Sequence, residues 1–221
     1  MIWITLIIAG AVFIGVPIVV ALVMTVPMAQ AVVTPIPDEF SHRVRIKASR
    51  VADDAEVAAL GFSFEGVYEV DFGMGKALFV VWRHGRDATY LAAYTTDATR
   101  GRWITDLVSI LSVRPHLTVT TSTAKEGHTV PPRAGDHMQT FDEISLKGLW
   151  QHHTDAEAHL AEKHGITPGR VEMPGGTMLR TYLRDSSTYR LQRPWVWLTV
   201  PYRYWIGKHL LHNRPITKRG V

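Results

Sequence analysis

Residues 62–72 read Phe-Ser-Phe-Glu-Gly-Val-Tyr-Glu-Val-Asp-Phe, and no other stretch after residue 37 predicts its local structure as clearly. Large apolar side chains recur at every second position over most of this stretch, with polar side chains between them. Because successive side chains of a β-strand point to opposite faces of a sheet, this pattern predicts a half-buried antiparallel strand. We expect its core-facing side to carry Phe62, Phe64, Gly66, Tyr68, Val70 and Phe72.

The residues that follow predict further strands and then helices. Short apolar or Thr- and Val-rich runs, separated by turns, lie at 77–82, 88–96, 103–111 and 117–123. With the first strand they predict an antiparallel sheet of about five strands. Ser145 is a favourable helix N-cap and Gly165 a favourable C-terminal stop, so a helix is expected between them, and 175–191 suggests another. The sequence therefore predicts an α+β domain with a helix packed on the sheet.

An uncharged segment precedes this domain, since the first 37 residues contain no Asp, Glu, Lys or Arg. A helix needs ~20 apolar residues to cross a ~30 Å hydrocarbon core, and residues 2–26 supply them. Pro17 lies near the middle of this segment and has no N–H for the carbonyl one helical turn earlier. A neighbouring group therefore has to bind that carbonyl. Ala11 and Gly15 are small residues four apart, where another helix would approach closely, although such pairs also arise by chance. We predict a single transmembrane helix that contacts the lipid bilayer.

A cleaved signal peptide is the alternative, because Ala29-Gln30-Ala31 matches the small-residue cleavage pattern. The segment lacks the basic residues that precede a signal's apolar core, and it is roughly twice the usual length, which favours the anchor. Cations follow the segment and none precedes it, so the N-terminus is expected outside and the domain in the cytoplasm, as in a bacterial inner-membrane protein. These cations are Arg43, Arg45, Lys47 and Arg50.

The C-terminal part of the chain is basic and aromatic. Residues 186–221 hold seven Lys or Arg and no acidic residue, within a chain of net charge +4. On an anchored protein this combination favours lipid headgroups over nucleic acid. We expect an amphipathic tail that contacts the membrane surface or a membrane partner, unless its Trp residues complete the core. The expected contact residues are Trp195, Trp197, Tyr202, Arg203, Trp205, Lys208, Lys218 and Arg219.

The sequence thus divides into four segments. We expect a transmembrane anchor at 1–28, a linker at 29–50, an α+β domain at 51–185 and the tail at 186–221. The part after the anchor is long enough for one domain with its own core and too short for two.

Histidines are the main candidates for chemistry, because the chain contains 11 of them. The densest group lies on the helix predicted after Ser145, at His152, His153, His159 and His164. None of these pairs has the three- or four-residue spacing that brings two rings together for a metal. His153 lies on the apolar stripe of this helix and is expected to be a core residue. We therefore predict no metal and no cofactor.

These observations predict a single-pass, membrane-anchored accessory or scaffold subunit of a larger bacterial-type membrane complex, without catalytic activity. Two alternatives stay open. The first is a membrane-tethered hydrolase or metal-dependent enzyme that uses the His-rich helix and the loop at 125–137. The second is a peripheral lipid-binding module that acts through the tail. Other membrane protein subunits are the expected partners, and nucleic acid is not.

Overall fold

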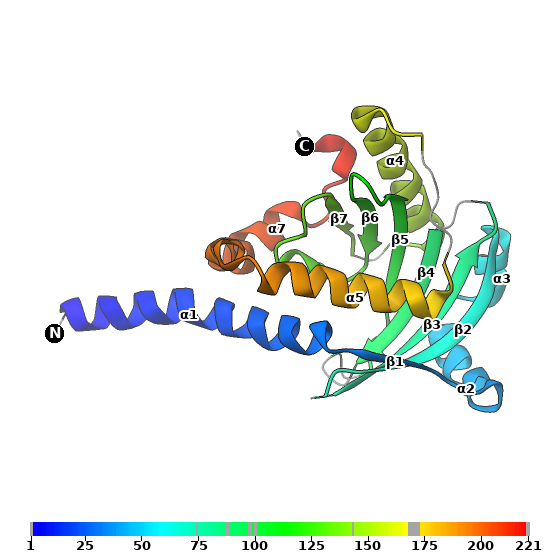
Figure 1. Cartoon of the computed structure of the whole chain (residues 1–221), viewed down its shortest axis with the longest axis horizontal. Coiled ribbons are helices and arrows are strands. Elements are labelled where there is room, and N and C mark those ends of the chain that lie inside the picture. Colours follow the sequence, from blue (N-terminus) through cyan, green and yellow to red (C-terminus); the bar gives the residue numbers. More distant parts are fainter. Residues whose placement is uncertain are drawn as a thin grey trace.

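The computed structural model describes residues 2–73, 75–86, 89–96, 99, 101–142, 144–167 and 173–219. These residues form one sheet with helices on both of its faces, and an N-terminal helix that projects from one side (Figure 1). The fold is α+β, as the sequence predicts. The sheet differs from the prediction in having seven strands instead of about five, and in being mixed instead of antiparallel.

The strands are arranged in the sheet in the same order as in the chain. Every neighbouring pair is antiparallel except β6 and β7, which are parallel. The strands are β1 (Val32–Pro35), β2 (Phe62–Asp71), β3 (Lys76–His84), β4 (Thr89–Thr96), β5 (Ile104–Ser112), β6 (Leu117–Ser122) and β7 (Asp136–Thr140). The two strands that the prediction missed, β1 and β7, are the edge strands. Both are too short for a period-two pattern to stand out from the surrounding residues.

Helices precede the sheet, connect its first strands and follow its last strand. The longer ones are α1 (Ile2–Ala29), α2 (Asp38–Ala48), α4 (Leu146–His164) and α5 (Gly175–Leu191), and α3 (Asp54–Ala59) is short. The tail continues as one helical run made of η3 (Pro194–Thr199), α6 (Val200–Tyr202), the π-helical η4 (Arg203–Gly207) and α7 (Lys208–Leu211); η5 (Ile216–Lys218) follows as a single turn, and η2 (Lys125–His128) precedes β7. Residues 29–50 contain β1 and α2, so this segment belongs to the packed fold. Residues 44–47, which resemble a short strand in the sequence, are helical within α2.

A β-bulge in β2 changes which of its side chains face which side. The pairing with β3 shifts between Phe64 and Gly66. Phe62 and Val67 consequently share one face and pack in one core cluster, whereas Val70 packs in a second cluster on the opposite face. The expectation of a single core-facing side from 62 to 72 is therefore wrong. A bulge inserts one residue into one strand only, which moves every later side chain to the other face.

The bulge also positions the next long helix, α5. Glu65 points toward α5, and its Oε1 accepts a hydrogen bond from the backbone N–H of Gly175, the first residue of that helix. Pro174, at the N-cap position, provides no side-chain cap, so a carboxylate from β2 binds one of the free N–H groups. A Cβ at Gly175 would lie 3.1 Å from Cγ1 of Val81, which explains why a glycine lies at this contact.

Both faces of the sheet are buried. On one face α4 contributes Leu146 and Leu149 to a cluster that includes Trp82 and Leu107. On the other face α5 contributes Met178, Leu179 and Leu183, which pack on Val70, Phe79, Tyr90 and Val108. The central strands are therefore apolar on both sides, and a third cluster joins the C-terminal half of α4 to β6 and to Ile216 of the tail.

Helix α4 begins and ends where the sequence predicts. The hydroxyl of Ser145 accepts a hydrogen bond from the N–H of Gly148, at 3.1 Å, and Gly165 ends the helix with φ = 61°. His153 is completely buried, as expected, and its two ring nitrogens lie 2.9 Å from the hydroxyls of Ser109 and Thr121. This ring is a hydrogen-bonded core residue that connects α4 to the middle of the sheet.

Candidate functional site

Helix α1 has two halves with different surroundings. The C-terminal half packs against α5, and its buried residues Pro17, Ala21 and Thr25 recur every four positions. The N-terminal half, residues 3–16, projects beyond the rest of the protein and is nearly all exposed (Figure 1). The helix is long and apolar enough to cross a membrane, and only 11% of its most apolar 18-residue window is buried. A core helix of a soluble protein would be mostly buried.

The tail binds α1 at the position where Pro17 interrupts its hydrogen bonding. In an α-helix the N–H of residue 17 would bind the carbonyl of residue 13, and proline has no N–H. The indole Nε1 of Trp205 donates to the carbonyl oxygen of Phe13 instead, at 2.9 Å. The two rings also stack, with centroids 5.3 Å apart and an interplanar angle of 12°. The group that the sequence requires beside Pro17 thus comes from the tail of the same chain.

The tail presents apolar and cationic groups together near the middle of α1. Trp195 is 60% exposed and Leu198 is 79% exposed, and Tyr202, Ile206 and Leu210 are also exposed. Its cations lie against aromatic rings. The guanidinium of Arg193 is 4.3 Å from the ring centre of Tyr189, and Nζ of Lys208 is 4.5 Å from that of Tyr204. Cation–π pairs of this kind occur throughout folded proteins, whereas exposed Trp and Tyr side chains are enriched at membrane–water interfaces.

The remaining residues of the expected tail contact have different surroundings. Trp197 and Arg203 are partly buried, and Lys218 is exposed. Arg219 holds the end of the chain on the sheet, because its guanidinium donates to the carbonyls of Met138 and Leu211, each at 2.7 Å. Burial lowers the pKa of Arg219 to about 10. The tail therefore divides into an exposed part beside α1 and an end that is fastened to β7.

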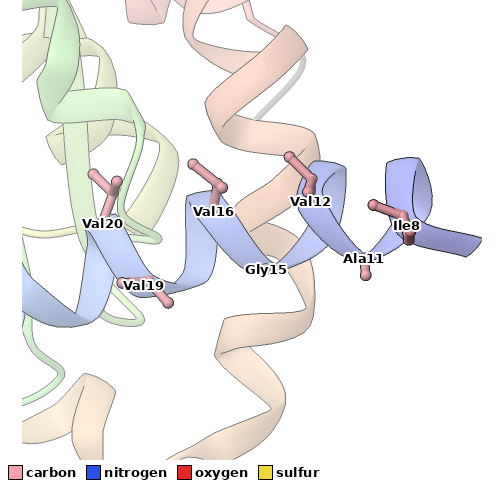
Figure 2. Close-up of a pocket in the computed structure, with 7 residues that line it drawn as sticks. All are labelled: Ile8, Ala11, Val12, Gly15, Val16, Val19 and Val20. Atoms are coloured by element: carbon pink, nitrogen blue, oxygen red, sulfur yellow. The ribbon is translucent and has the colours of Figure 1, made fainter.

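A shallow, open groove along α1, from Ile8 to Val20, contains both predicted small residues (Figure 2). At about 100° per residue, Ala11 and Gly15 lie roughly opposite Phe13 on the helix, so the tail leaves this side open. A Cβ at Gly15 would meet no atom within 4 Å. The groove is lined by Ile8, Ala11, Val12, Gly15, Val16, Val19 and Val20.

A second concave feature lies inside the domain, between α5 and the sheet. This cavity of ≈ 700 Å³ has the sheet face of β3 to β6 as its floor and α5 as its roof, and the C-terminal end of α1 closes part of it. Its wall includes apolar side chains from each of these elements, such as Met28 of α1, Phe79 and Val108 of the sheet, and Leu179 and Leu183 of α5. The volume lies within the roughly 300–1,000 Å³ range of small-molecule sites.

The floor of the cavity carries one buried carboxyl group, that of Asp106. The strand register places Asp106 between Ala92 of β4 and Ser122 of β6. Burial raises the pKa of Asp106 to about 7, and the hydroxyls of Ser122 and Tyr94, which lower it, do not offset the burial. Burial likewise raises the pKa of Tyr182, which lies above on α5. The sequence analysis did not identify Asp106. A lone carboxylate within an apolar strand could have indicated it as a candidate site residue.

A second carboxyl group, that of the partly buried Asp136 at the start of β7, has a different environment. It lies 2.7 Å from both the Nε2 of His116 and the hydroxyl of Thr118. Burial raises the pKa of Asp136, but the two hydrogen bonds and the charges of His116 and Arg190 together lower it by more, so the pKa lies below its ordinary value. Within the described ranges, no group of three or more His, Asp or Glu side chains is arranged to hold a metal ion.

No family model, curated protein or solved structure that was compared with this chain matches it. Its function therefore has to be inferred from its own residues and geometry.

Proposed function

We propose that this protein is a membrane-anchored, non-catalytic accessory subunit of a larger membrane complex. One observation carries the proposal. The N-terminal half of α1 exposes apolar side chains around its whole circumference, from Trp3 to Val16, and Trp205 of the tail contacts it at Phe13. Apolar patches of this size on soluble proteins mark contacts with a membrane or a partner.

The polar surface of α5 limits how deeply the protein enters the bilayer. Arg180, Arg184 and Asp185 are exposed on α5, which lies beside the C-terminal half of α1 (Figure 1). Charged side chains are costly in hydrocarbon, so the bilayer has to cover residues up to about 16 and leave α5 in water. The exposed aromatic part of the tail then lies where the helix enters the membrane, which supports a second lipid contact.

Charges on the domain side of the projecting half support the proposed orientation. Arg193, Arg203 and Lys208 lie in the tail, whose turn α6 packs on α1, and Arg43 and Lys47 are exposed on α2. No cationic side chain is present in the sequence before α1 ends. An excess of cations on this side favours a cytoplasmic domain and an N-terminus outside.

The short projecting half also favours a helical partner. About 15 residues at 1.5 Å each span ~22 Å, which is less than the ~30 Å hydrocarbon core. A helix that is too short is accommodated by a thinner bilayer or by association with other helices. The groove at Ala11 and Gly15 provides the surface on which a second helix packs closely. This is the reason for proposing a subunit of a complex instead of an isolated anchored domain.

The test is co-purification from membranes in a mild detergent. Gly15→Leu places a side chain in the groove, and a Cβ at this position meets no atom within 4 Å, so we expect folding to be retained and the partner to be lost. Gly10→Leu is the matched control, because a Cβ at Gly10 also meets no atom within 4 Å but lies outside the groove. A wild-type protein that purifies alone, or partners retained equally by both variants, would contradict the proposal.

The enzyme alternative finds less support in the described residues. His153, in the His-rich helix, is completely buried and hydrogen-bonded to Ser109 and Thr121, so its nitrogens are occupied. The lipid-binding alternative is compatible with the accessory role, because the exposed aromatic tail and the projecting half of α1 face the same membrane.

A further inference from the structure

The cavity between α5 and the sheet contains three buried polar atoms that have no hydrogen-bond partner among the described residues. They come from three elements: Oδ1 of Asp106 on β5, the hydroxyl of Ser187 on α5 and the hydroxyl of Thr25 on α1. Ser187 is 0% exposed, Thr25 is 1% exposed and Asp106 is 9% exposed. Buried polar atoms are nearly always hydrogen-bonded, and an unpaired one costs free energy. Three around a single cavity indicate that molecules from outside the chain bind there.

Asp106 is the most costly of the three, because its group can carry a charge. Among the described residues, Asp106 lacks the cationic and imidazole partners that surround Asp136. Asp136 receives hydrogen bonds from His116 and Thr118 and lies near Arg190, whereas the groups that interact with Asp106 are the hydroxyls of Ser122 and Tyr94. A buried carboxylate without a cation is unstable unless a cation is supplied from outside the chain.

The other charged residues that line the cavity do not supply this cation. Lys76 forms an ion pair with Glu69 at 2.6 Å, and Arg102 and Glu126 are exposed. Arg190 donates through Nε to the carbonyl of Pro131 at 2.7 Å. The interior of the cavity therefore combines one uncompensated acid with a mostly apolar wall.

We infer that this cavity binds a small amphiphilic amine, with its ammonium group at Asp106 and its apolar body between the sheet and α5. The ammonium donates to the unpaired Oδ1 of Asp106. The body packs on Phe79 and Val108 below and on Leu179 and Leu183 above. The C-terminal end of α1 lines the cavity with Val23 and Met28, so the anchor helix forms part of the wall of this site. This inference does not depend on the proposed accessory role.

The test measures the binding of naphthylmethylamine and of its neutral analogue naphthylmethanol to the full-length protein in lipid nanodiscs. Calorimetric titration at about pH 8 keeps the amine protonated, and empty nanodiscs provide the lipid background. We expect saturable binding of the amine. The alcohol cannot form the ion pair, so its affinity should be lower by roughly 10-fold or more. No saturable binding of the amine to the wild type would mean that the cavity holds water only, and would overturn the inference.

Variants separate the carboxylate from the cavity. Asp106→Asn keeps the shape of the side chain and should weaken binding of the amine by roughly 10-fold or more while leaving the alcohol unchanged. Glu126→Gln, an exposed acid that also lines the cavity, is the control and should change neither. Ala92→Leu fills the space beside Asp106 and should abolish binding of both ligands. Equal amine affinity for the wild type and Asp106→Asn, or an equal loss in Glu126→Gln, would overturn the inference even if the cavity binds apolar molecules.

Discussion

The indole Nε1–H of Trp205 donates a 2.9 Å hydrogen bond to the carbonyl oxygen of Phe13, which lies 192 residues earlier in the chain. This carbonyl is free because Pro17 has no N–H to give it. In the apolar surroundings of α1 an unpaired carbonyl is costly. The proline leaves the carbonyl free and the tryptophan binds it. Together they hold the helical part of the tail against α1.

The first prediction concerns this hydrogen bond. Trp205→Phe keeps a ring for stacking on Phe13 but removes the donor, and it should lower the free energy of unfolding by about 1–2 kcal/mol. Denaturant unfolding in detergent measures the change. Trp195→Phe is the control and should have little effect, because Trp195 is 60% exposed.

A double-mutant cycle distinguishes the hydrogen bond from general packing. Pro17→Ala provides an N–H for the carbonyl of Phe13 within the helix. In this background Trp205→Phe should cost less than about 0.5 kcal/mol, because the carbonyl no longer needs the indole. The same cost in both backgrounds would show that the cost comes from packing of the indole ring and not from the carbonyl that Pro17 leaves free.

The second prediction tests the bulge in β2. Val67 is 2% exposed and packs on the α4 side of the sheet, whereas an unbroken alternation would place it in solvent with Ser63. Val67→Asp should cost several kcal/mol because it buries a charge, and Ser63→Asp should cost less than about 0.5 kcal/mol. Thermal unfolding followed by circular dichroism measures both. Similar stability of the two variants would refute the bulge and restore the one-sided strand.

The third prediction concerns the pH dependence of stability. Burial raises the pKa of Asp106 to about 7, above the 3.8 of the unfolded chain. Between these two values the folded state binds more protons than the unfolded state, so the free energy of unfolding falls as pH rises through this window. The asparagine variant cannot titrate. Relative to Asp106→Asn, the wild type should lose on the order of 4 kcal/mol between about pH 4 and pH 8, at 1.36 kcal/mol per pKa unit.

Urea titrations at several pH values measure this difference. Asp185→Asn, which removes an exposed carboxyl group from α5, is the control and should follow the wild-type profile. A difference between the wild type and Asp106→Asn that is constant over the window would show that Asp106 does not titrate there.

The fourth prediction concerns topology, and the chain suits it because it contains no cysteine. A single cysteine in place of Ser49, at the end of α2, should be shielded from an impermeant thiol reagent in intact cells and should react after lysis. A cysteine in place of Leu198, which is 79% exposed in the protein, should stay unreactive in lysed membranes and react after solubilisation in detergent. Labelling of Ser49→Cys in intact cells would reverse the proposed orientation. Rapid labelling of Leu198→Cys in membranes would exclude a lipid contact there.

Local signals in the sequence predicted most of the secondary structure. Strands β3, β4, β5 and β6 follow from short apolar or Thr- and Val-rich runs between turns, and α4 follows from Ser145 and Gly165. These features depend on neighbouring residues, whose spacing alone decides which side chains meet. Gly66, beside the out-of-step Val67, was a local hint of the bulge, since glycine within a strand often marks one.

Other features depend on residues that are distant in the sequence, and only the tertiary structure decided them. The edge strands β1 and β7 exist because β2 and β6 present free hydrogen-bonding groups to them. Asp106 acquires its unusual environment from α5 and α1, which are not adjacent to β5 in the sequence. Pro17 shows the division most clearly. The sequence by itself determined that the carbonyl of Phe13 needs a donor, because proline has no N–H, whereas the path of the whole chain decided that Trp205 provides it.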